Sequence, residues 1–344
     1  MYRAEFELET ITPLFMRGAD QSKAEFRSAS VKGVMRWWFR ALAGSYFGNN
    51  IRNLQKAECR VFGCAGSGET RRSSVIVQVD YSNATYGSRP LPMVWNKHTN
   101  KRVKKNAIVE GSSLTVILES PQLESLKIAA VSLIAMSYFG GLGFRNNRGA
   151  GSTAIRVVDA PEGIMPEEFL PSKLAGFKKL PKLLQNELKE GLAQLLRGGF
   201  PKRQSQNSSS CPQYSTIKEN CFRIYLWNSR ANLSDVYYKS DNLYDNDTNL
   251  NLLDEFEKEF KNKIKNKKKH ISRHGYKDFI FGMANPRRSS PLKVGVVRLD
   301  GKYYLRLSVF KTEPYHPRRQ NVDWNHLFGF LQNIRARQVY PNRS

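Results

Sequence analysis

The chain has 344 residues, 40% of them hydrophobic, which is enough for two domains with ordinary packed cores. Its 55 Lys and Arg residues outnumber 30 Asp and Glu residues, and the formal net charge of +25 at pH 7 predicts a polyanionic partner, nucleic acid ahead of an anionic membrane surface. The N-terminal sequence lacks the apolar core of a signal peptide, and the longest uncharged run (128–144) contains serines and glycines, so we expect a cytoplasmic protein without a membrane span.

The first 160 residues predict four strands and two helices. The strands show alternating or β-branched side chains, and the helices show apolar residues three and four positions apart. In chain order we expect a strand over 3–11, a helix over 30–48, strands over 73–81 and 112–120, a helix over 122–139 and a strand over 152–159. A basic stretch, 95–106, looks too polar to pack. This order is that of the ferredoxin-like fold, which RNA-recognition modules share.

The second half predicts the same order with its last strand missing or unrecognised. In chain order we expect a helix over 180–199, a polar connection over 204–215, a strand over 221–228, a helix over 250–270, strands over 292–299 and 302–310, and a helix over 322–337. Asp300 and Gly301 form a strong two-residue hairpin signal between the last two strands. We therefore predict an α+β protein with two tandem ferredoxin-like (RRM-like) βαββαβ domains, 1–160 and 161–344, the second degenerate with inserted helices.

A basic stripe marks the first predicted helix. Lys32, Arg36 and Arg40 are four residues apart, so each lags the previous one by about 40° on the helix surface. The stripe contains no acid, and it begins next to Ser30, a suitable N-cap, where free backbone N–H groups favour anions. Contact with phosphates and a solvated polar face are both consistent with this pattern. The neighbouring Trp37 is expected to pack in the fold rather than to stack on a base.

A glycine-rich loop, GGLGFRNNRGAGS (140–152), follows the second predicted helix. A helix C-cap explains one of its first glycines but not the later ones. Glycines let a main chain approach a ligand closely, and the planar forks of Arg145 and Arg148 suit phosphates. We favour a loop that binds a nucleic-acid backbone over a purely structural turn. Its candidate glycines are Gly140, Gly141, Gly143, Gly149 and Gly151.

Other basic segments are less distinctive. The lysine-rich runs 97–105 and 261–269 are typical of solvated, mobile segments that add affinity without specificity. The segment NPRRSSPL (285–292) differs, because prolines restrict the chain on both sides of Arg287 and Arg288. Two interpretations of this segment remain open, namely a second loop that contacts nucleic acid and a simple turn before a strand.

Cofactor chemistry finds little support. Cys59, Cys64, Cys211 and Cys221 have spacings of five and ten, unlike zinc knuckles, so reduced structural thiols are expected rather than a metal site. The five histidines do not adjoin a plausible nucleophile. Asp20 lies in a polar loop and is a minor candidate for a metal-assisted nuclease. We expect no cofactor, no metal and no catalytic residue.

With these motifs in view, the chain resembles the first-subunit family of the Cmr complex, the type III-B CRISPR effector, within the RAMP superfamily. The resemblance covers the first 155 residues well and the remainder thinly. It is carried by ITPLFMRGAD, SASVKGVMRWWFRAL, VFG (61–63), GGLGFRNNRGAGS and FGMANPRRSSPL. The glycine loop alone would mark only the superfamily, whereas the Ser-x-Lys-Gly-x-x-Arg pattern with tryptophan is more specific.

The resemblance implies a subunit of a ribonucleoprotein that uses a guide RNA to bind invading transcripts in antiviral defence. It implies a position at the end that holds the 3′ region of the guide, with guide or target single-stranded RNA and other Cmr subunits as partners. An RNA-facing cleft would then be lined by Lys32, Arg36, Arg40, Arg145, Arg148, Arg287 and Arg288. In the superfamily, target cutting is assigned to the repeated backbone subunit through a loop aspartate.

Three functions are therefore compared. A non-catalytic RNA-binding subunit is the leading hypothesis, because the basic stripe, the glycine loop and the predicted fold agree. A metal-dependent endoribonuclease using Asp20 is the second. A protein-interaction scaffold whose charge serves only solubility is the third.

Overall fold

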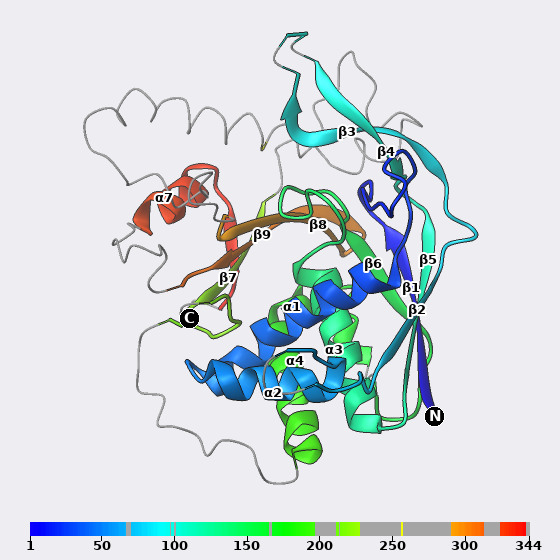
Figure 1. Cartoon of the computed structure of the whole chain (residues 1–344). Coiled ribbons are helices and arrows are strands. Elements are labelled where there is room, and N and C mark those ends of the chain that lie inside the picture. The colour runs from blue at the N-terminus through cyan, green and yellow to red at the C-terminus, as the bar shows by residue number, and fades with distance from the viewer. Residues whose placement is uncertain are drawn as a thin grey trace.

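The structure is a computed structural model that describes residues 1–66, 70–96, 98–99, 101–164, 167–196, 211–212, 214–227, 256, 290–312 and 324–341. These residues form two four-stranded antiparallel sheets, a two-stranded ribbon and a layer of helices (Figure 1). The fold is thus mixed α and β with antiparallel sheets, in line with the predicted class. The helix expected over 250–270 lies outside the described residues except at Phe256.

The first sheet has the strand order β2-β5-β1-β6, and every pair is antiparallel. Its strands are β1 (Tyr2–Thr10), β2 (Ile76–Asp80), β5 (Ser113–Ser120) and β6 (Thr153–Asp159). All four were expected from the sequence within a few residues. In β1 the alternation places Ala4, Phe6 and Leu8 in the core and leaves the intervening glutamates on the outer face.

Helices cover the inner face of this sheet (Figure 1). They are α1 (Ser28–Phe47), α2 (Ile51–Phe62), α3 (Leu123–Phe139) and α4 (Leu174–Leu195), with a short 3₁₀ turn, η1 (Glu167–Phe169). Helix α3 is buried almost all round, as its uniformly apolar sequence requires. Helix α2 was not predicted, although Asn50 caps it by accepting a hydrogen bond from the Asn53 N–H at 3.1 Å.

The second sheet repeats the strand order of the first. It runs β10-β7-β9-β8, again antiparallel throughout, with β7 (Phe222–Trp227), β8 (Leu292–Leu299), β9 (Lys302–Phe310), β10 (Arg337–Tyr340) and helix α7 (Asn325–Asn333). In each half, the first strand lies between the fourth and the third, and the second strand is outermost. The predicted hairpin is confirmed, with Asp300 and Gly301 both at positive φ.

Two elements of the second half differ in their bounds from the expected ones, and the strand that was expected to be missing or unrecognised is present. The last strand is present as β10, which begins at the final residue of the helix expected over 322–337 and continues beyond it. The helix ends early because Arg335 adopts a φ of 58°, which turns the chain away from the helical path. Helix α4 begins six residues before the predicted start and contains Pro181, so the proline does not mark its first turn.

The described part of the basic stretch 95–106 also contains strand residues, which was not expected. Strands β3 (Tyr86–Trp95) and β4 (Arg102–Ile108) pair into a ribbon that extends at the top of Figure 1. Pairing satisfies the backbone while Lys104 and Lys105 stay in solvent, and Ala107 and Ile108 anchor the base in the core. A sequence can therefore be too polar for a core and still form a strand.

One hydrophobic core joins the two halves. Helix α4 follows residue 160 but packs against α1 and α3 of the first half. Phe222 of the second sheet packs on Phe139 and on Phe310, with ring centroids 5.9 and 4.7 Å apart. The two sheets are thus held in one body around these aromatic side chains.

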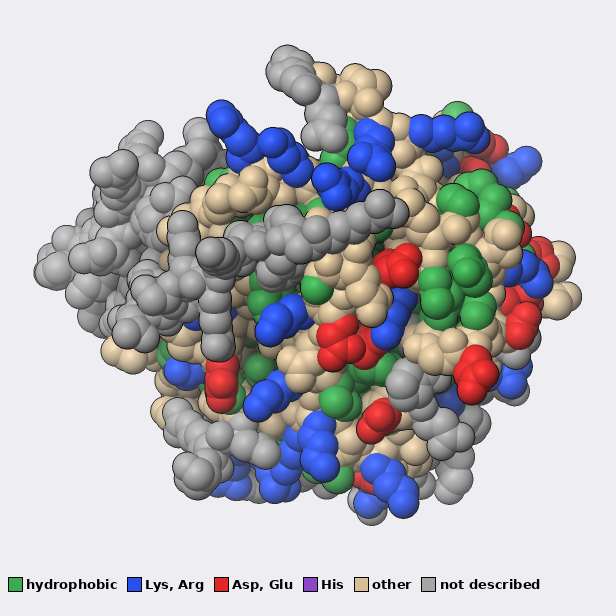
Figure 2. Space-filling model, turned by 90° about the horizontal axis from the view of Figure 1, so that it is seen from below, with side chains coloured by type: hydrophobic (Ala, Val, Ile, Leu, Met, Phe, Trp, Pro, Cys, Tyr) green, Lys and Arg blue, Asp and Glu red, His purple; other side chains and the backbone are tan. Residues whose placement is uncertain are grey.

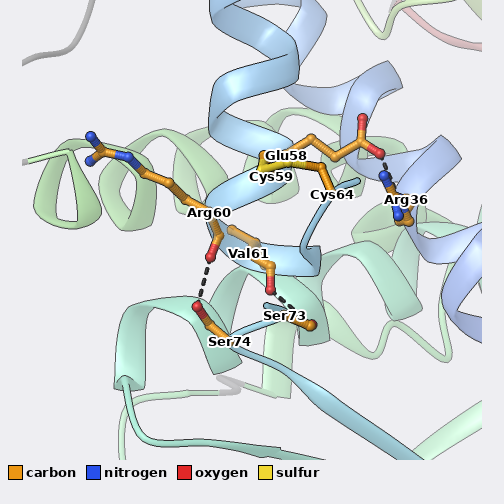
Figure 3. The surroundings of a disulfide bond; sticks show 8 residues. All are labelled: Arg36, Glu58, Cys59, Arg60, Val61, Cys64, Ser73 and Ser74. Atoms are coloured by element: carbon orange, nitrogen blue, oxygen red, sulfur yellow. Dashed lines mark hydrogen bonds and ion pairs between the residues drawn. A yellow bond between two sulfur atoms is a disulfide. The ribbon is translucent and has the colours of Figure 1, made fainter. Parts of the chain in front are cut away.

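The cysteines are bonded in pairs, which contradicts the expected reduced thiols. Cys59 joins Cys64, and Cys211 joins Cys221, with Cα–Cα distances of 5.0 and 5.6 Å. Cys59 lies in the last turn of α2 and Cys64 directly follows Gly63, so this turn brings the two sulfurs together (Figure 3). Sequence spacing did not carry this information.

Candidate nucleic-acid interface

The glycine-rich loop leaves the C-terminus of α3 and packs against the chain that follows β1. A side chain at Gly143 would lie 2.5 Å from the Phe15 carbonyl oxygen, and one at Gly151 would lie 2.0 Å from that of Leu142. Gly143, Gly149 and Gly151 also adopt positive φ, which L-residues with side chains rarely do. A Cβ at Gly140 would meet the Trp38 indole at 2.6 Å.

These contacts explain why glycine occupies these positions, and the explanation differs from the one that the sequence suggested. The loop approaches its own chain closely, so the fold itself requires several of its glycines. Gly141 follows the same rule, because a Cβ there would lie 3.0 Å from the carbonyl oxygen of Gly151. Contact between this backbone and RNA remains a prediction.

The two arginines of the loop lie between Gly143 and Gly149. Arg145 adopts a φ of 64°, and its guanidinium carbon lies 5.5 Å from the centroid of the Phe144 ring. The Arg148 N–H donates to the Arg145 carbonyl at 2.8 Å, and Arg148 forms a parallel bridge with Val294 of β8. Both side chains are half-buried. The loop is therefore a tightly packed turn that carries two half-buried guanidinium groups, of which that of Arg145 lies beside an aromatic ring, while Arg145 Nε and Arg148 Nη1 are themselves buried.

The second sheet supports this loop through Lys293. Its ammonium donates to Asn147 Oδ1 at 2.7 Å and lies 4.2 Å from the Trp37 ring centroid. Burial, with a smaller contribution from the Arg306 charge, lowers the pKa of Lys293 to about 8. Trp37 also packs edge-on against Phe310 at 5.4 Å, so its expected packing role is confirmed.

A buried arginine holds the start of the loop. Arg306 of β9 is fully buried and donates to the carbonyl oxygens of Tyr138 at 2.8 Å and Gly140 at 2.5 Å. These carbonyls end α3, where the helix dipole is negative. Burial lowers the pKa of Arg306 to about 9. Gly295 of β8 leaves room for the guanidinium, because a Cβ there would lie 1.9 Å from it.

An acid from the neighbouring helix forms ion pairs with two of the three cations in the basic stripe of α1. Glu58 of α2 accepts from Arg36 Nε at 2.6 Å and from Arg40 Nη1 at 2.8 Å, and Figure 3 shows Arg36 facing Glu58. Lys32 donates to Ser73 Oγ at 2.7 Å and to the Val75 carbonyl at 3.0 Å.

From the sequence of α1 alone, the stripe was interpreted as having no acid to pair with. The structure shows that α1 itself supplies no such acid but that a neighbouring helix does. The glutamate that balances it lies in the helix that sequence reasoning missed. Ser30 is also not the N-cap, because α1 begins at Ser28 and Arg27 takes that position without a side-chain capping bond. Whether any of these residues contacts RNA remains a prediction.

The stripe and the glycine loop lie on different sides of α1. Ser30 and Val34 face a cavity of about 500 Å³ that Gly143 and Phe144 of the loop also line. On an α-helix with 3.6 residues per turn, the centre of the stripe is about 130° from the side that carries Ser30, Val34 and Trp37. The structure thus brings Ser30 and part of the loop together, but separates both from the ion-paired stripe.

Two further sites were predicted from the sequence, the arginine pair of the segment 285–292 and the loop aspartate Asp20. Arg287 and Arg288 lie outside the described residues. Asp20 is exposed, and its Oδ1 accepts hydrogen bonds from the Ser22 N–H at 2.9 Å and Oγ at 2.5 Å, which lowers the pKa of its carboxyl group. Among the described residues, no group of three His, Cys, Asp or Glu side chains is placed to hold a metal ion.

One face of the molecule carries charged side chains of both signs (Figure 2). On the face drawn in Figure 2, basic side chains are spread over the surface with acidic ones among them. The outer face of the first sheet carries ion pairs, including Arg298 with Glu9 at 2.8 Å and Arg156 with Glu7. In the part of the chain that the structure describes, no helix is long and apolar enough to cross a membrane.

Sequence reasoning missed three residues around the cavity. Arg17 and Lys105 line it, the latter from a stretch that was expected to be mobile, and Phe144 stands at its edge with 59% of its surface exposed. A single large apolar residue inside a glycine- and arginine-rich loop was the available signal for Phe144.

Comparison with known proteins identifies the family. A model of the RAMP superfamily matches residues 7–154, and a model described as the C-terminal domain of Cmr1 matches residues 219–341. Over 98% of its length, the chain is 30% identical to the CRISPR system Cmr subunit Cmr1-1 of Pyrococcus furiosus, 96% of which is covered. The chain belongs to the Cmr1 family. The resemblance stated from the sequence motifs is therefore confirmed.

Other members and structures agree with this assignment to the Cmr1 family. The CRISPR system Cmr subunit Cmr1-2 of P. furiosus is 40% identical over 186 residues, which are 46% of this chain and 97% of that relative. The crystal structure of Cmr1 from P. furiosus in its apo form matches 99% of both chains with a TM-score of 0.65 and 26% identity. A chain of the type III-B Cmr-beta complex bound to cognate target RNA shares the fold, with a TM-score of 0.50 and 13% identity over 97% of this chain and 99% of that one.

Proposed function

We propose that this Cmr1-family chain is a non-catalytic RNA-binding subunit of a cytoplasmic type III-B CRISPR ribonucleoprotein. It helps to bind target RNA near the 3′ end of the guide RNA in antiviral defence, together with other Cmr subunits. Its two halves, 1–160 and 161–344, form two ferredoxin-like domains in tandem. The repeated strand order of the two sheets supports this arrangement.

Family membership supports the place in the complex, and charge supports the ligand. The net charge of +25 favours a polyanion, and a related fold occurs in a complex described as bound to target RNA. A sugar–phosphate strand offers repeated negative groups that arginine forks bind well.

One observation carries the RNA contact, namely the rigid loop that presents Arg145 and Arg148. Its backbone is fixed by its own close contacts, and Arg306 and Lys293 hold it from the second sheet. Because the guanidinium groups are positioned before RNA arrives, little conformational entropy is lost on binding. The loop is therefore the primary phosphate contact in this proposal.

The remaining candidates are secondary contacts. Lys32 keeps neutral partners, whereas Arg36 and Arg40 share one negative charge with Glu58. The stripe therefore keeps two of its three positive charges. It extends the interface only if the RNA also passes over that side of α1. Arg287 and Arg288 complete the proposed set.

No observation favours the nuclease using Asp20. Its carboxylate is exposed and already accepts two bonds from Ser22, with Lys23 Nζ 3.9 Å away. Incubation of the purified chain with single-stranded RNA and Mg²⁺ or Mn²⁺ tests this point. Cleavage that disappears in Asp20→Ala would overturn the non-catalytic assignment.

Titration of labelled single-stranded RNA at several KCl concentrations tests the proposal. A single-strand binder loses log K at about 0.7 per phosphate neutralised for each unit of log [salt]. The double variant Arg145→Ala/Arg148→Ala should bind more weakly and lower that slope by about 1.4. The matched control, Arg3→Ala/Arg156→Ala, removes the same charge from the outer face of the first sheet, where both arginines are ion-paired.

Two results would count against the proposal. Equal losses in both double variants would show that only net charge matters. Weak binding with a flat salt dependence in the unmodified chain would favour the protein-interaction scaffold instead.

A further inference from the structure

A cavity of about 500 Å³ lies where four segments of the first half meet. They are the chain after β1, the N-terminal part of α1, the β3–β4 ribbon and the glycine loop. Arg17 ties two of them together, since it donates to the Gln21 carbonyl at 2.5 Å and to the Asn106 carbonyl of β4 at 3.4 Å. Asn106 in turn donates to the Ser22 carbonyl at 2.8 Å. These bonds hold the walls in place without a ligand.

The floor of the cavity is apolar. Phe15, Met16 and Leu91 line it and are nearly inaccessible to solvent, at 2%, 4% and 5% exposure. Val34 adds a partly exposed aliphatic wall, and the Ser30 hydroxyl supplies a polar group beside it. A flat, largely apolar ligand with a polar edge matches this lining.

An exposed aromatic ring stands at the cavity mouth. Phe144 is 59% exposed although its N–H donates to the Phe15 carbonyl at 2.7 Å, so the fold fixes its backbone and leaves its ring uncovered. Among the described residues, few large apolar side chains are comparably exposed. A fixed, uncovered ring is a suitable platform for stacking.

The rim is positively charged. Arg17 and Lys105 line the cavity, and neither forms an ion pair with an acid in the part of the chain that the structure describes. Arg145 lies next to Phe144 with its guanidinium facing that ring. When a ligand enters the cavity, the chemical groups attached to that ligand therefore lie close to several cationic side chains.

We propose that this cavity takes one unpaired nucleobase of the bound RNA, which stacks on Phe144 while its flanking phosphates lie against Arg17, Lys105 and Arg145. The inference rests on the proposed RNA-binding function and narrows it to one nucleotide. The combination of apolar floor, aromatic ring and cationic rim matches a nucleotide, which joins a planar base to an anionic backbone. An apolar side chain from a protein partner would fill the floor but would supply no anion to Arg17 and Lys105.

Cross-linking provides the direct test on the full-length chain. Short single-stranded RNA containing 5-iodouridine is bound, irradiated and digested, and the modified peptide is identified by mass spectrometry. A uracil stacked on the ring should give a cross-link at Phe144.

Affinity measurements give an independent readout. Loss of a base–aromatic stack costs about 1–3 kcal/mol, so Phe144→Ala should weaken RNA binding by about 5-fold or more, and Phe144→Trp should restore it. The salt slope should not change in Phe144→Ala, because no phosphate contact is lost, whereas Lys105→Ala should lower it by about 0.7. Tyr86→Ala is the matched control, because Tyr86 is a 50% exposed ring on the β3–β4 ribbon that does not line the cavity.

The outcomes separate this inference from the function on which it rests. If RNA binding depends on Arg145 and Arg148 but no cross-link reaches Phe144 and Phe144→Ala binds normally, only the nucleobase site is wrong. If the unmodified chain does not bind RNA, the proposed function fails as well. If Phe144→Ala binds RNA normally but no longer assembles with other Cmr subunits, the cavity takes a protein side chain and the inference is overturned.

Discussion

Replacement of Gly151 by alanine should destabilise the protein far more than an ordinary glycine substitution. Gly151 has a φ of 63°, and a left-handed conformation costs a residue with a Cβ about 1–2 kcal/mol. Its Cβ would also lie 2.0 Å from the Leu142 carbonyl oxygen, so the backbone must move by roughly 1 Å to reach the shortest contacts that real Cβ atoms make.

Such a shift breaks hydrogen bonds that close the loop. The Gly151 carbonyl accepts from the Leu142 N–H at 2.8 Å, and the Gly151 N–H donates to the Pro13 carbonyl at 2.9 Å. At about 1 kcal/mol for each bond, the total for Gly151→Ala is about 3–4 kcal/mol. Gly301 is the matched control, since its φ is 70° but nothing lies within 4 Å of its Cβ position, so Gly301→Ala should cost only about 1–2 kcal/mol.

Urea denaturation followed by tryptophan fluorescence measures both variants under the same conditions. Equal destabilisation of Gly151→Ala and Gly301→Ala would refute the argument that internal contacts require this glycine. If Gly151→Ala were also to lose RNA affinity while remaining as stable as the control, the glycine would serve the approach of the ligand instead.

Two further predictions concern charged residues. In the folded protein the pKa of Lys293 is about 8, against an ordinary value of 10.5. Between these pH values the unfolded chain binds more protons than the folded one, so the stability of the folded protein rises with pH. Relative to Lys293→Met, the unmodified protein should gain about 2 kcal/mol of stability between pH 7.5 and 9.5, and parallel stability profiles of the two proteins would contradict this. Glu58→Gln should lower stability by about 1–2 kcal/mol, a modest amount because Arg36 and Arg40 remain partly in water, and added salt should reduce the loss. If the stripe contacts RNA, Glu58→Gln should also steepen the salt dependence of binding; an unchanged slope would exclude the stripe from the interface.

The sequence predicted elements well where local pattern and packing agree. Strands β8 and β9 were predicted at their observed bounds, because alternating or β-branched residues flank an Asp-Gly turn. The positions of the four strands of the first sheet along the chain were predicted from alternating or β-branched residues as well. Helix α2 was missed although it buries Leu54, Ala57, Val61 and Phe62 on one face. The β3–β4 ribbon was missed because its order depends largely on pairing between its two backbones.

The candidate site was harder to predict because its contacts join distant parts of the chain. The glycine loop was found from composition alone, but the reason for its glycines lies more than 100 residues away, at Phe15 and Pro13. The stripe on α1 was found from helical spacing, whereas the ion pairs of Arg36 and Arg40 with Glu58 depend on how α2 packs. Spacing identifies which side chains share a helix face, but it does not show what the face contacts.

The loop that carries the proposed RNA contact depends on both halves of the chain. Arg306 and Lys293 belong to the second sheet, yet they bind the carbonyls at the start of the loop and the side chain of Asn147 within it. Each brings a positive charge into a partly or fully buried position without an acid, and each pKa is lowered as a result. Such residues are costly for stability unless their bonds to the loop are made. The arrangement therefore couples the conformation of Arg145 and Arg148 to the packing of the second sheet, so that substitutions in β8 or β9 should alter RNA affinity without touching RNA.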